Sequence, residues 1–376
     1  MNLFADMTYE GARANTGPFL GALGASAVAV GFIAGAGELL GYALRSVSGY
    51  FADKSHRYWA VIFLGYFVNM MAVPALALAG NWPAAGALIV AERTGRAIRK
   101  PAVEAMISHA GKSMGHGWVF GLNEALDQTG ATVGPLITAL ILYLHGSYQR
   151  AFATLLVPAV LCLIALTLAR VAYPRPHELE QRTPQLPQTK GFSKAYWAYL
   201  AAGALMACGF ADFSLIAFHF RKAAVVGPDM VPVFYAIAMV IAAVTALVAG
   251  RMLDKVGLQA PLIAFALAAF SAPFVFLGGP TAALCGLLLW GIGMGAQDSS
   301  LKAVLASIVP GERRGTAFGV FDTAFGVAWF AGSAAMGLLY ERSIVGVVLF
   351  SVVLQLAALP VFYAAKRYEP KGIIGP

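Results

Sequence analysis

The chain has 376 residues, of which 59% are hydrophobic and only 12% are charged, and its mean hydropathy is +0.73. A soluble domain carries about 25% charged residues, so this composition excludes a soluble protein and predicts a surface that faces lipid. The net charge of +8 does not indicate nucleic-acid binding, because the basic residues follow the pattern of membrane topology.

Twelve stretches of the chain are long and apolar enough to cross about 30 Å of hydrocarbon. They lie at 2–22, 26–50, 58–79, 84–106, 118–144, 150–172, 195–219, 231–252, 259–278, 281–305, 315–339 and 344–365. The connector 173–194 has four prolines, several charges and no apolar period, which is typical of a flexible linker. We therefore predict an all-α membrane protein of about twelve transmembrane helices. Its expected parts are an N-terminal six-helix bundle (1–172), a cytoplasmic linker (173–194), and a C-terminal six-helix bundle with a short cytoplasmic tail (195–376).

Lysine and arginine predict the orientation, because they accumulate on the cytoplasmic side of a membrane. If both termini and the connectors after the even-numbered spans are cytoplasmic, that side holds 21 of the 26 basic residues. The five exceptions are Arg13, Arg150, Arg221, Lys222 and Arg342. The sequence thus predicts a multi-pass protein of the cytoplasmic (inner) membrane with both termini inside.

Ionisable residues inside a span are costly unless they face a cavity or a partner, so each is a candidate for function. In the first span, Asp6, Glu10 and Arg13 share one helix face. Either this face lines a cavity, or Arg13 neutralises Glu10 and the face packs inward. Two acids face one base, and burial favours the neutral form of the remaining acid, which suits proton coupling. A separate hypothesis is that the natural chain begins upstream of Met1, because only five residues precede Asp6.

Further candidates for a substrate or proton pathway lie in four other spans. Glu38 is isolated among glycine and leucine, and either the arginine of the first span or a solute is its expected partner. Glu124 and Asp127 are three residues apart, near enough to disfavour ionisation of both. They have either a coupling role or a salt-bridge or capping role. Asp212 lies deep in the seventh span, and Asp322 in the eleventh span mirrors Glu124.

Two short patterns recur at nearly one offset, which indicates a duplication. The pattern Gly-x-x-x-Asp-Lys at 49–54 recurs 201 residues later at 250–255. The pattern Phe-Gly followed by an acid at 120–124 recurs 198 residues later at 318–322. Parallel repeats of six spans place a solute site near the membrane midplane and predict alternating access by rocking of the bundles.

On these patterns the chain resembles the major facilitator superfamily over nearly its whole length. Residues 49–57 resemble the signature loop of that family between spans 2 and 3, and residues 250–257 resemble its weaker C-terminal copy. The resemblance implies that these loops hold the two bundles in one state. The expected gating residues are Gly49, Asp53, Lys54, Arg57, Gly250, Asp254 and Lys255.

The fifth span contains Gly130-x-x-x-Gly134-Pro135, which resembles the motif of the family's antiporters. Thr138-Ala139 stand where that motif has its trailing glycine pair. From the residues alone, two glycines four apart favour close helix contact, and the proline favours a bend.

Three arginines, Arg93, Arg96 and Arg99, lie near the end of the fourth span. The span occupies the place of another family motif, but Ile89 stands where that motif has its arginine. We therefore expect this basic cluster to anchor the helix end in lipid headgroups.

No common enzyme motif occurs: HExxH, GxSxG and GxxxxGK[ST] are all absent. The three cysteines are far apart, which offers neither a disulfide framework nor a metal site. We predict no enzyme activity, no cofactor and no metal.

The leading prediction is a monomeric secondary transporter of this superfamily that exports a small solute in exchange for protons, which is an efflux antiporter. An uptake symporter or uniporter is the alternative, kept open by Thr138-Ala139. A transporter-like sensor without flux is the second alternative. The mixed charges suit cationic, zwitterionic or amphipathic solutes, and the substrate stays open.

Overall fold

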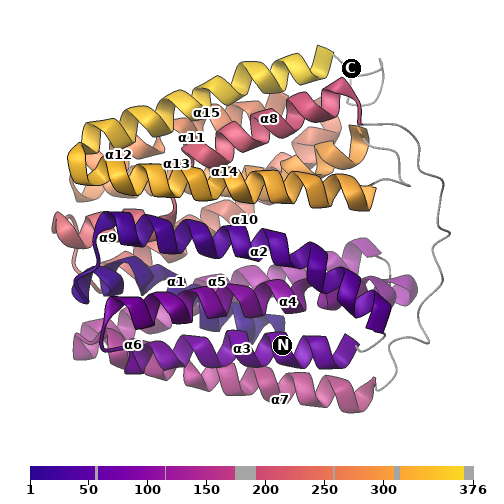
Figure 1. Cartoon of the computed structure of the whole chain (residues 1–376), viewed down its shortest axis with the longest axis horizontal. Helices are drawn as coiled ribbons and strands as arrows, with labels where there is room; N and C mark the ends of the chain where they lie inside the picture. The colour runs from indigo at the N-terminus through magenta and orange to yellow at the C-terminus, as the bar shows by residue number, and fades with distance from the viewer. Residues whose placement is uncertain (56–57, 115, 174–191, 257–258, 309–313, 368–376) are drawn as a thin grey trace. The chain divides into compact units, whose positions relative to one another are not determined.

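The computed structural model describes the chain except residues 56–57, 115, 174–191, 257–258, 309–313 and 368–376 (Figure 1). Its described part consists of helices and short connections. The elements are, in chain order, α1 (Asn2–Ala22), α2 (Ala27–Ser55), α3 (Tyr58–Ala75), η1 (Leu76–Leu78), α4 (Trp82–Met114), α5 (His116–His145), α6 (Tyr148–Thr154), α7 (Leu156–Ala172), α8 (Lys194–Gly209), α9 (Phe213–Lys222), α10 (Met230–Val256), α11 (Gln259–Ala269), α12 (Ser271–Leu277), α13 (Pro280–Ile308), α14 (Arg314–Arg342) and α15 (Ile344–Arg367).

These elements correspond to the twelve predicted spans, and the predicted fold class is confirmed. The third span ends in the 3₁₀ turn η1, and the sixth, seventh and ninth spans each consist of two consecutive helices (α6–α7, α8–α9 and α11–α12). The main differences are at the cytoplasmic ends predicted for spans 2, 4 and 8. There α2, α4 and α10 continue to Ser55, Met114 and Val256, beyond the expected ends at 50, 106 and 252.

By length and composition, six helical stretches of the described part are apolar enough to cross a membrane. They are Trp59–Leu78, Tyr148–Ala172, Lys194–Lys222, Met230–Ala249, Ala317–Arg342 and Ile344–Ala365. Two shorter apolar stretches are Ala27–Gly41 and Pro261–Leu277. The helix α1 is not in this set because Asp6, Glu10 and Arg13 give it three charged residues. A span that carries such charges needs partners inside the protein.

Contacts divide the chain into two compact units. Unit 1 comprises Met1–Ala25, Ala36–Pro184 and Phe220–Ala236, and unit 2 comprises Ser26–Gly35, Gln185–His219 and Ile237–Pro376. The division predicted at 173–194 stays a prediction, because 174–191 lie outside the described residues.

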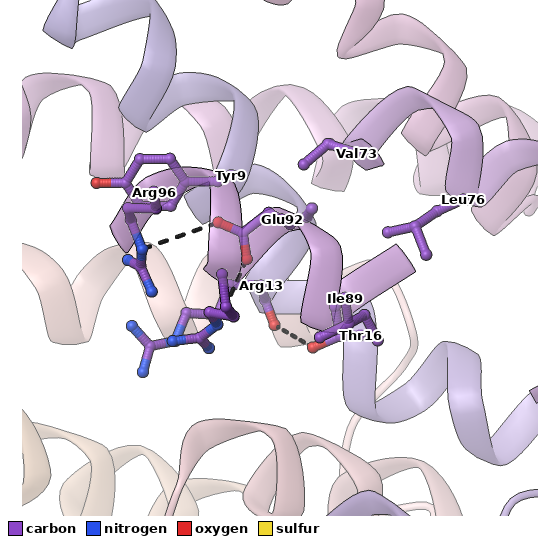
Figure 2. Close-up of a pocket in the computed structure, with 10 residues that line it drawn as sticks. Tyr9, Arg13, Thr16, Val73, Leu76, Ile89, Glu92 and Arg96 are labelled. Atoms are coloured by element: carbon purple, nitrogen blue, oxygen red, sulfur yellow. Dashed lines mark hydrogen bonds and ion pairs between the residues drawn. The ribbon is translucent and has the colours of Figure 1, made fainter. Parts of the chain in front are cut away.

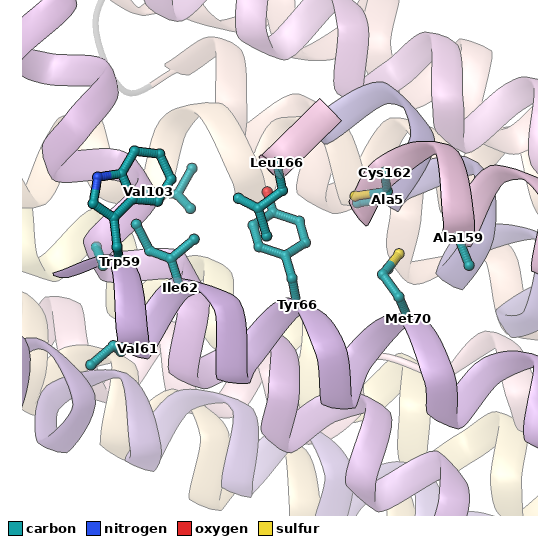
Figure 3. Close-up of a cluster of buried hydrophobic side chains, with 11 residues drawn as sticks. Ala5, Trp59, Val61, Ile62, Tyr66, Met70, Val103, Ala159, Cys162 and Leu166 are labelled. Atoms are coloured by element: carbon teal, nitrogen blue, oxygen red, sulfur yellow. The ribbon is translucent and has the colours of Figure 1, made fainter. Parts of the chain in front are cut away.

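The apolar core of unit 1 lies where α1, α3, α4 and α7 meet (Figure 3). Tyr66 and Met70, one turn apart on α3, are completely buried and point to the same side of the helix as Ile62. The other members of this cluster are Ala5, Trp59, Val61, Ala102, Val103, Ala159, Cys162 and Leu166. This packing holds α1 and α4 against a common partner, α3.

Glycines bring α1 and α5 of unit 1 into backbone contact. A Cβ atom on Gly130 would lie 2.8 Å from the Asp6 Cβ, and one on Gly134 would lie 2.8 Å from the Met7 carbonyl carbon. Gly11 on α1 faces Gly134 in the same way, at 3.0 Å. Real Cβ atoms do not approach backbone this closely, so the two helices meet only because these positions lack a side chain.

Replacing Gly134 with alanine is therefore expected to separate α1 from α5 and to cost about 1–3 kcal/mol of stability, because the backbone that the new Cβ meets cannot yield. We expect a lower thermal unfolding midpoint, measured by tryptophan fluorescence of the purified protein in detergent. The matched control is Gly41→Ala in α2, where an added Cβ meets no atom within 4 Å. Equal midpoints for the two variants would contradict this assignment.

In unit 2, α8, α14 and α15 run side by side (Figure 1). The seventh span is interrupted between Gly209, where α8 ends, and Phe213, where α9 begins. Backbone carbonyls at such a break lack helical partners. Ser351 and Gln355 of α15 donate to the Gly209 carbonyl at 2.7 and 3.1 Å, and Trp290 of α13 donates to the Ala211 carbonyl at 2.9 Å.

Candidate functional site

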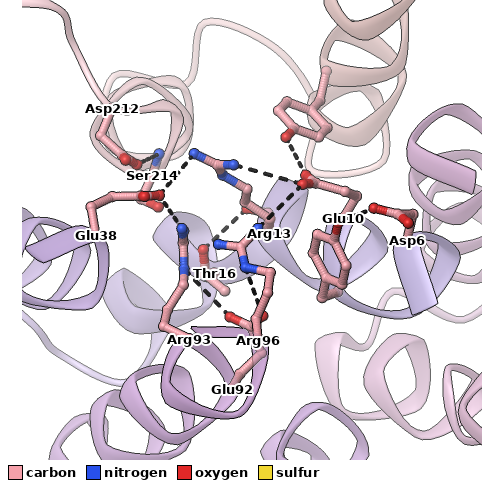
Figure 4. A network of polar contacts seen from close by, with 12 residues as sticks. Asp6, Glu10, Arg13, Thr16, Glu38, Glu92, Arg93, Arg96, Asp212 and Ser214 are labelled. Carbon is pink, nitrogen blue, oxygen red and sulfur yellow. Dashed lines mark hydrogen bonds and ion pairs between the residues drawn. The ribbon is translucent and has the colours of Figure 1, made fainter. Parts of the chain in front are cut away.

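Six charged side chains of unit 1 alternate in sign around a closed ring (Figure 4). They come from α1, α2 and α4, and each lies next to two members of opposite charge. In order around the ring they are Glu38, Arg93, Glu92, Arg96, Glu10 and Arg13. With three arginines and three glutamates, the ring has no net charge when all six are ionised.

The close contacts of the ring surround Glu38. Its Oε1 accepts from Nη1 of Arg93 in a short ion pair and lies 3.4 Å from Nη2 of Arg13. Arg93 continues the ring through its Nε, which lies 3.4 Å from Oε2 of Glu92. These four side chains are only 5–11% exposed. Since charges removed from water need such partners, this half of the ring is expected to depend on every member.

The longer contacts of the ring surround Arg96. Its Nε lies 3.9 Å from Oε1 of Glu92, and its Nη1 lies 3.9 Å from Oε1 of Glu10. Both distances exceed that of a hydrogen bond. The ring closes between Glu10 and Arg13, whose Oε1 and Nη1 are 3.7 Å apart.

Neutral side chains of unit 1 contact two glutamates and an arginine of the charged ring. Asn69 on α3 donates to the Glu92 carboxylate at 2.9 Å and to its backbone carbonyl at 3.1 Å. Tyr235 on α10 donates to Oε2 of Glu10. The guanidinium of Arg96 lies over the aromatic side chain of Tyr9, 4.7 Å from the centre of the phenol group, which is a cation–π arrangement.

A pair of acids lies beside the ring, where Asp6 on α1 meets Asp127 on α5. Their carboxyl groups lie near enough to interact electrostatically. Asp6 also accepts from the Tyr9 hydroxyl, and Asp127 accepts from the Asn123 amide at 3.0 Å. Two acids this close together and largely removed from water disfavour ionisation of both, which makes the pair a candidate proton site.

A small cavity opens against the ring (Figure 2). It is lined by Tyr9, Ala12, Arg13, Thr16, Val73, Leu76, Ile89, Glu92, Arg93 and Arg96, all of unit 1. The space open to the centre of a water molecule is about 20 Å³, which is room for about one water. Arginines are three of the four charged residues in this lining, and their other ring partners, Glu10 and Glu38, are not part of it.

The model of one family, described as the Major Facilitator Superfamily, matches residues 3–333 of the chain. The chain belongs to this superfamily. A protein of Mycobacterium tuberculosis described as uncharacterized is 38% identical over 372 residues, which cover 97% of this chain and 91% of that protein. An uncharacterized MFS-type transporter of Methanocaldococcus jannaschii is 24% identical over 337 residues, covering 85% and 82% of the two chains.

The fold is similar to that of a solved bacterial homolog of the human lysosomal transporter Spinster, in an inward-facing and occupied conformation. The TM-score is 0.77 at 16% identity, and the match covers 98% of this chain and 96% of that one. The protein is thus a multi-pass membrane protein and a secondary transporter of this superfamily, whose solutes are small molecules. Members are normally not enzymes, so the prediction of no enzyme activity is confirmed. The orientation of the termini stays a prediction.

Five of the acids and bases that the sequence singles out lie together in unit 1 of the transporter. These are Asp6, Glu10, Arg13, Glu38 and Asp127. From the sequence, either Glu10 or Glu38 is a possible partner of Arg13, and both pairs occur in the ring. Pro135 and the two glycines of the antiporter-like motif lie on α5, where Gly130 and Gly134 contact α1.

The other predicted residues do not join the ring. Asp322 is half-buried on α14, in unit 2. The side chain of Glu124 lies outside the described residues. The same holds for the predicted gating residues Gly49, Asp53, Lys54, Arg57, Gly250, Asp254 and Lys255, so their role stays a prediction.

Asp212 caps a helix of unit 2. It is 2% exposed and directly precedes α9, and its Oδ1 accepts from the backbone N–H of Ser214 at 2.8 Å. This is the geometry of an N-cap, which satisfies a donor that the helix itself leaves without a partner.

Replacing Asp212 with alanine is expected to cost about 1 kcal/mol of stability through loss of the cap. Asp212→Ser keeps a capping oxygen without an ionisable group, so it should retain both the unfolding midpoint and the transport rate. Solute flux into proteoliposomes measures the rate. A serine variant that is stable but inactive would show that the carboxyl group itself takes part in transport.

The sequence interpretation of the arginines in α4 is wrong. Arg93 and Arg99 are 4% and 6% exposed, and Arg93 and Arg96 belong to the ring, so they do not anchor the helix end in headgroups. A local signal was present in α4. Glu92 and Arg96 are four residues apart and follow Ile89 on one helix face, in the middle of the helix.

Proposed function

We propose that the protein is a proton-coupled transporter of the cytoplasmic membrane, with both termini inside, which acts as a monomer. The observation that carries this proposal is the pair of neighbouring acids, Asp6 and Asp127, beside the charged ring. Gain and loss of a proton by this pair is the step that we propose for coupling. The alternating ring is neutral, and the buried Arg99 of α4 also acts on Asp6, so the protonation of the pair decides whether this region carries a net charge.

The pair is placed to sense the ring. Asp6 and Glu10 lie one turn apart on α1, and Tyr9 contacts both Asp6 and Arg96. Charges this close in a low-dielectric interior influence each other strongly. A solute that changes the charge at the cavity therefore changes the proton affinity of the pair, and this mutual influence is the physical basis of coupling.

The direction of transport follows from the sign of the solute's charge. The excess of arginine in the cavity lining favours an anion. A bound anion favours protonation of the nearby acids, so anion and proton travel together, and an inward proton gradient then drives uptake. We therefore propose proton-linked uptake first.

Proton-linked export, the leading prediction from the sequence, remains the second candidate. Its support is the antiporter-like motif of α5, and it requires a cation that competes with protons for Asp6 and Asp127. The contacts of Gly130 and Gly134 with α1 explain the glycines of this motif by packing alone. The motif is therefore weaker evidence for solute–proton exchange.

Reconstitution tests both directions together. Proteoliposomes receive a mixture of cellular metabolites inside and outside, a pH gradient of either sign is imposed, and mass spectrometry follows both compartments. Uptake predicts that one anionic solute accumulates on the alkaline side, and export by exchange predicts that a cation accumulates on the acidic side. A protein that redistributes no solute under either gradient would contradict the proposed coupling.

A further inference from the structure

The cavity of unit 1 has one charged end and one apolar end (Figure 2). Tyr9, Arg96 and Glu92 gather on one side, and Val73 and Leu76 lie on the other. Ala12 and Ile89 extend the apolar wall, and the Thr16 hydroxyl donates to a backbone carbonyl of α1 at 3.0 Å. A solute that fits both ends has a charged head and a short hydrocarbon body.

Of the arginines that line the cavity, Arg96 is the one whose existing contacts an incoming group can replace at the lowest cost in free energy. Its contacts with Glu92 and Glu10 are both 3.9 Å long, whereas Arg93 is held by Glu38 in a short ion pair. A guanidinium has five N–H donors in a planar fork that matches two oxygens of one anion. The fork of Arg96 is therefore available for closer, bidentate bonds than the ring supplies.

We infer that the charged end of this cavity binds the carboxylate group of a small monocarboxylate solute, and that the apolar end holds its hydrocarbon part. This inference rests on the proposed function and names its substrate class. The incoming carboxylate replaces that of Glu92 on Arg96, and it matches Glu92 in charge and planar shape. Glu92 keeps the hydrogen bond from Asn69, so its displacement does not leave it without a donor.

The size of the cavity limits the hydrocarbon part. The cavity volume is only about 20 Å³, so a solute must displace side chains as it enters. A hydrocarbon part of a few carbons needs the least displacement. Butyrate is therefore a suitable probe. Butyramide has the same length without charge, and butylammonium has the opposite charge.

Binding of these three probes to the purified full-length protein in detergent tests the inference, with the unfolding midpoint and isothermal calorimetry as readouts. We expect butyrate to bind at least about tenfold more tightly than butyramide, because charge-assisted bonds to arginine are the stronger kind. Butylammonium should not bind. Equal binding of butyrate and butyramide, or preference for butylammonium, would overturn the inference.

Variants locate the binding group. Arg96→Gln should weaken butyrate binding about tenfold or more, and Arg96→Lys should restore only part of it, because lysine lacks the planar fork. Glu92→Gln should strengthen binding severalfold, since it removes the competing carboxylate. The matched control is Arg150→Gln, an exposed arginine outside the cavity. Should Arg96→Gln not fold, unchanged or weaker butyrate binding by Glu92→Gln would still overturn the inference.

Equilibrium binding separates this inference from the proposed function. A protein that binds butyrate through Arg96 but shows no flux driven by a pH gradient would contradict proton coupling alone. A protein that moves another solute with protons and ignores butyrate would contradict the carboxylate site alone.

Discussion

Replacing Glu38 with glutamine is expected to destabilise the protein by about 3–5 kcal/mol, the typical effect of removing one partner from a buried ion pair. Glu38 is the carboxylate shared by Arg13 and Arg93, and its side chain is only 11% exposed. Glutamine keeps the size and one acceptor oxygen but removes the negative charge, which leaves two buried guanidinium groups with less compensation.

Unfolding of the purified protein in mixed micelles, followed by tryptophan fluorescence, measures this loss. The control is Glu341→Gln on α14, where the glutamate is exposed and its removal should change stability by less than about 0.5 kcal/mol. The double variant Glu38→Gln/Arg93→Gln should be more stable than the sum of the single effects predicts, because it removes both charges of one pair. Strictly additive effects would show that Glu38 and Arg93 do not interact energetically.

Replacing Asp6 with asparagine is expected to abolish accumulation of solute by a pH gradient while solute exchange at equal pH continues. Asparagine resembles a protonated aspartate in shape and hydrogen bonding, but it holds no exchangeable proton. For one proton per solute, a gradient of one pH unit supplies about 1.4 kcal/mol, which is about tenfold accumulation. In the variant, the solute concentrations inside and outside the proteoliposomes should become about equal.

The measurement uses proteoliposomes with the solute identified by reconstitution, and it compares net accumulation with counterflow. Asp127→Asn should behave like Asp6→Asn, because in the proposed mechanism the two neighbouring carboxyl groups share one proton. Asp229→Asn, between α9 and α10 and outside the ring, is the matched control and should accumulate solute normally. Full accumulation by Asp6→Asn would exclude the pair as the proton site.

The arrangement of the charged ring explains why these two changes should differ in kind. Glu38 lies in the half with close contacts, where each charge compensates its neighbours, so its loss is felt in stability. Asp6 lies beside the ring, and asparagine has nearly the size and shape of aspartic acid, so this change leaves the packing nearly unchanged and acts on the proposed proton site.

Much of the candidate site was predictable from residues close together in sequence. Asp6, Glu10 and Arg13 fall on one face of one helix, and their spacing alone places them together. The same holds for the small residues of α5, whose four-residue spacing predicts a close helix contact. The arginines of α4 were misjudged because their sequence neighbours resemble a basic helix end, and only burial distinguishes an interior cation from one in headgroups.

The sequence by itself determined the membrane class, the twelve helical spans and the acidic face of the first span, because apolar length and helical periodicity are local properties of a chain. Only the tertiary structure decided which charges meet. Glu38 contacts Arg93, which is 55 residues away in the sequence, and Asn69 donates to Glu92, which is 23 residues away. Such pairings depend on how α1, α2, α3 and α4 pack, and packing is set by side-chain shape along whole helices. No local pattern contains that information.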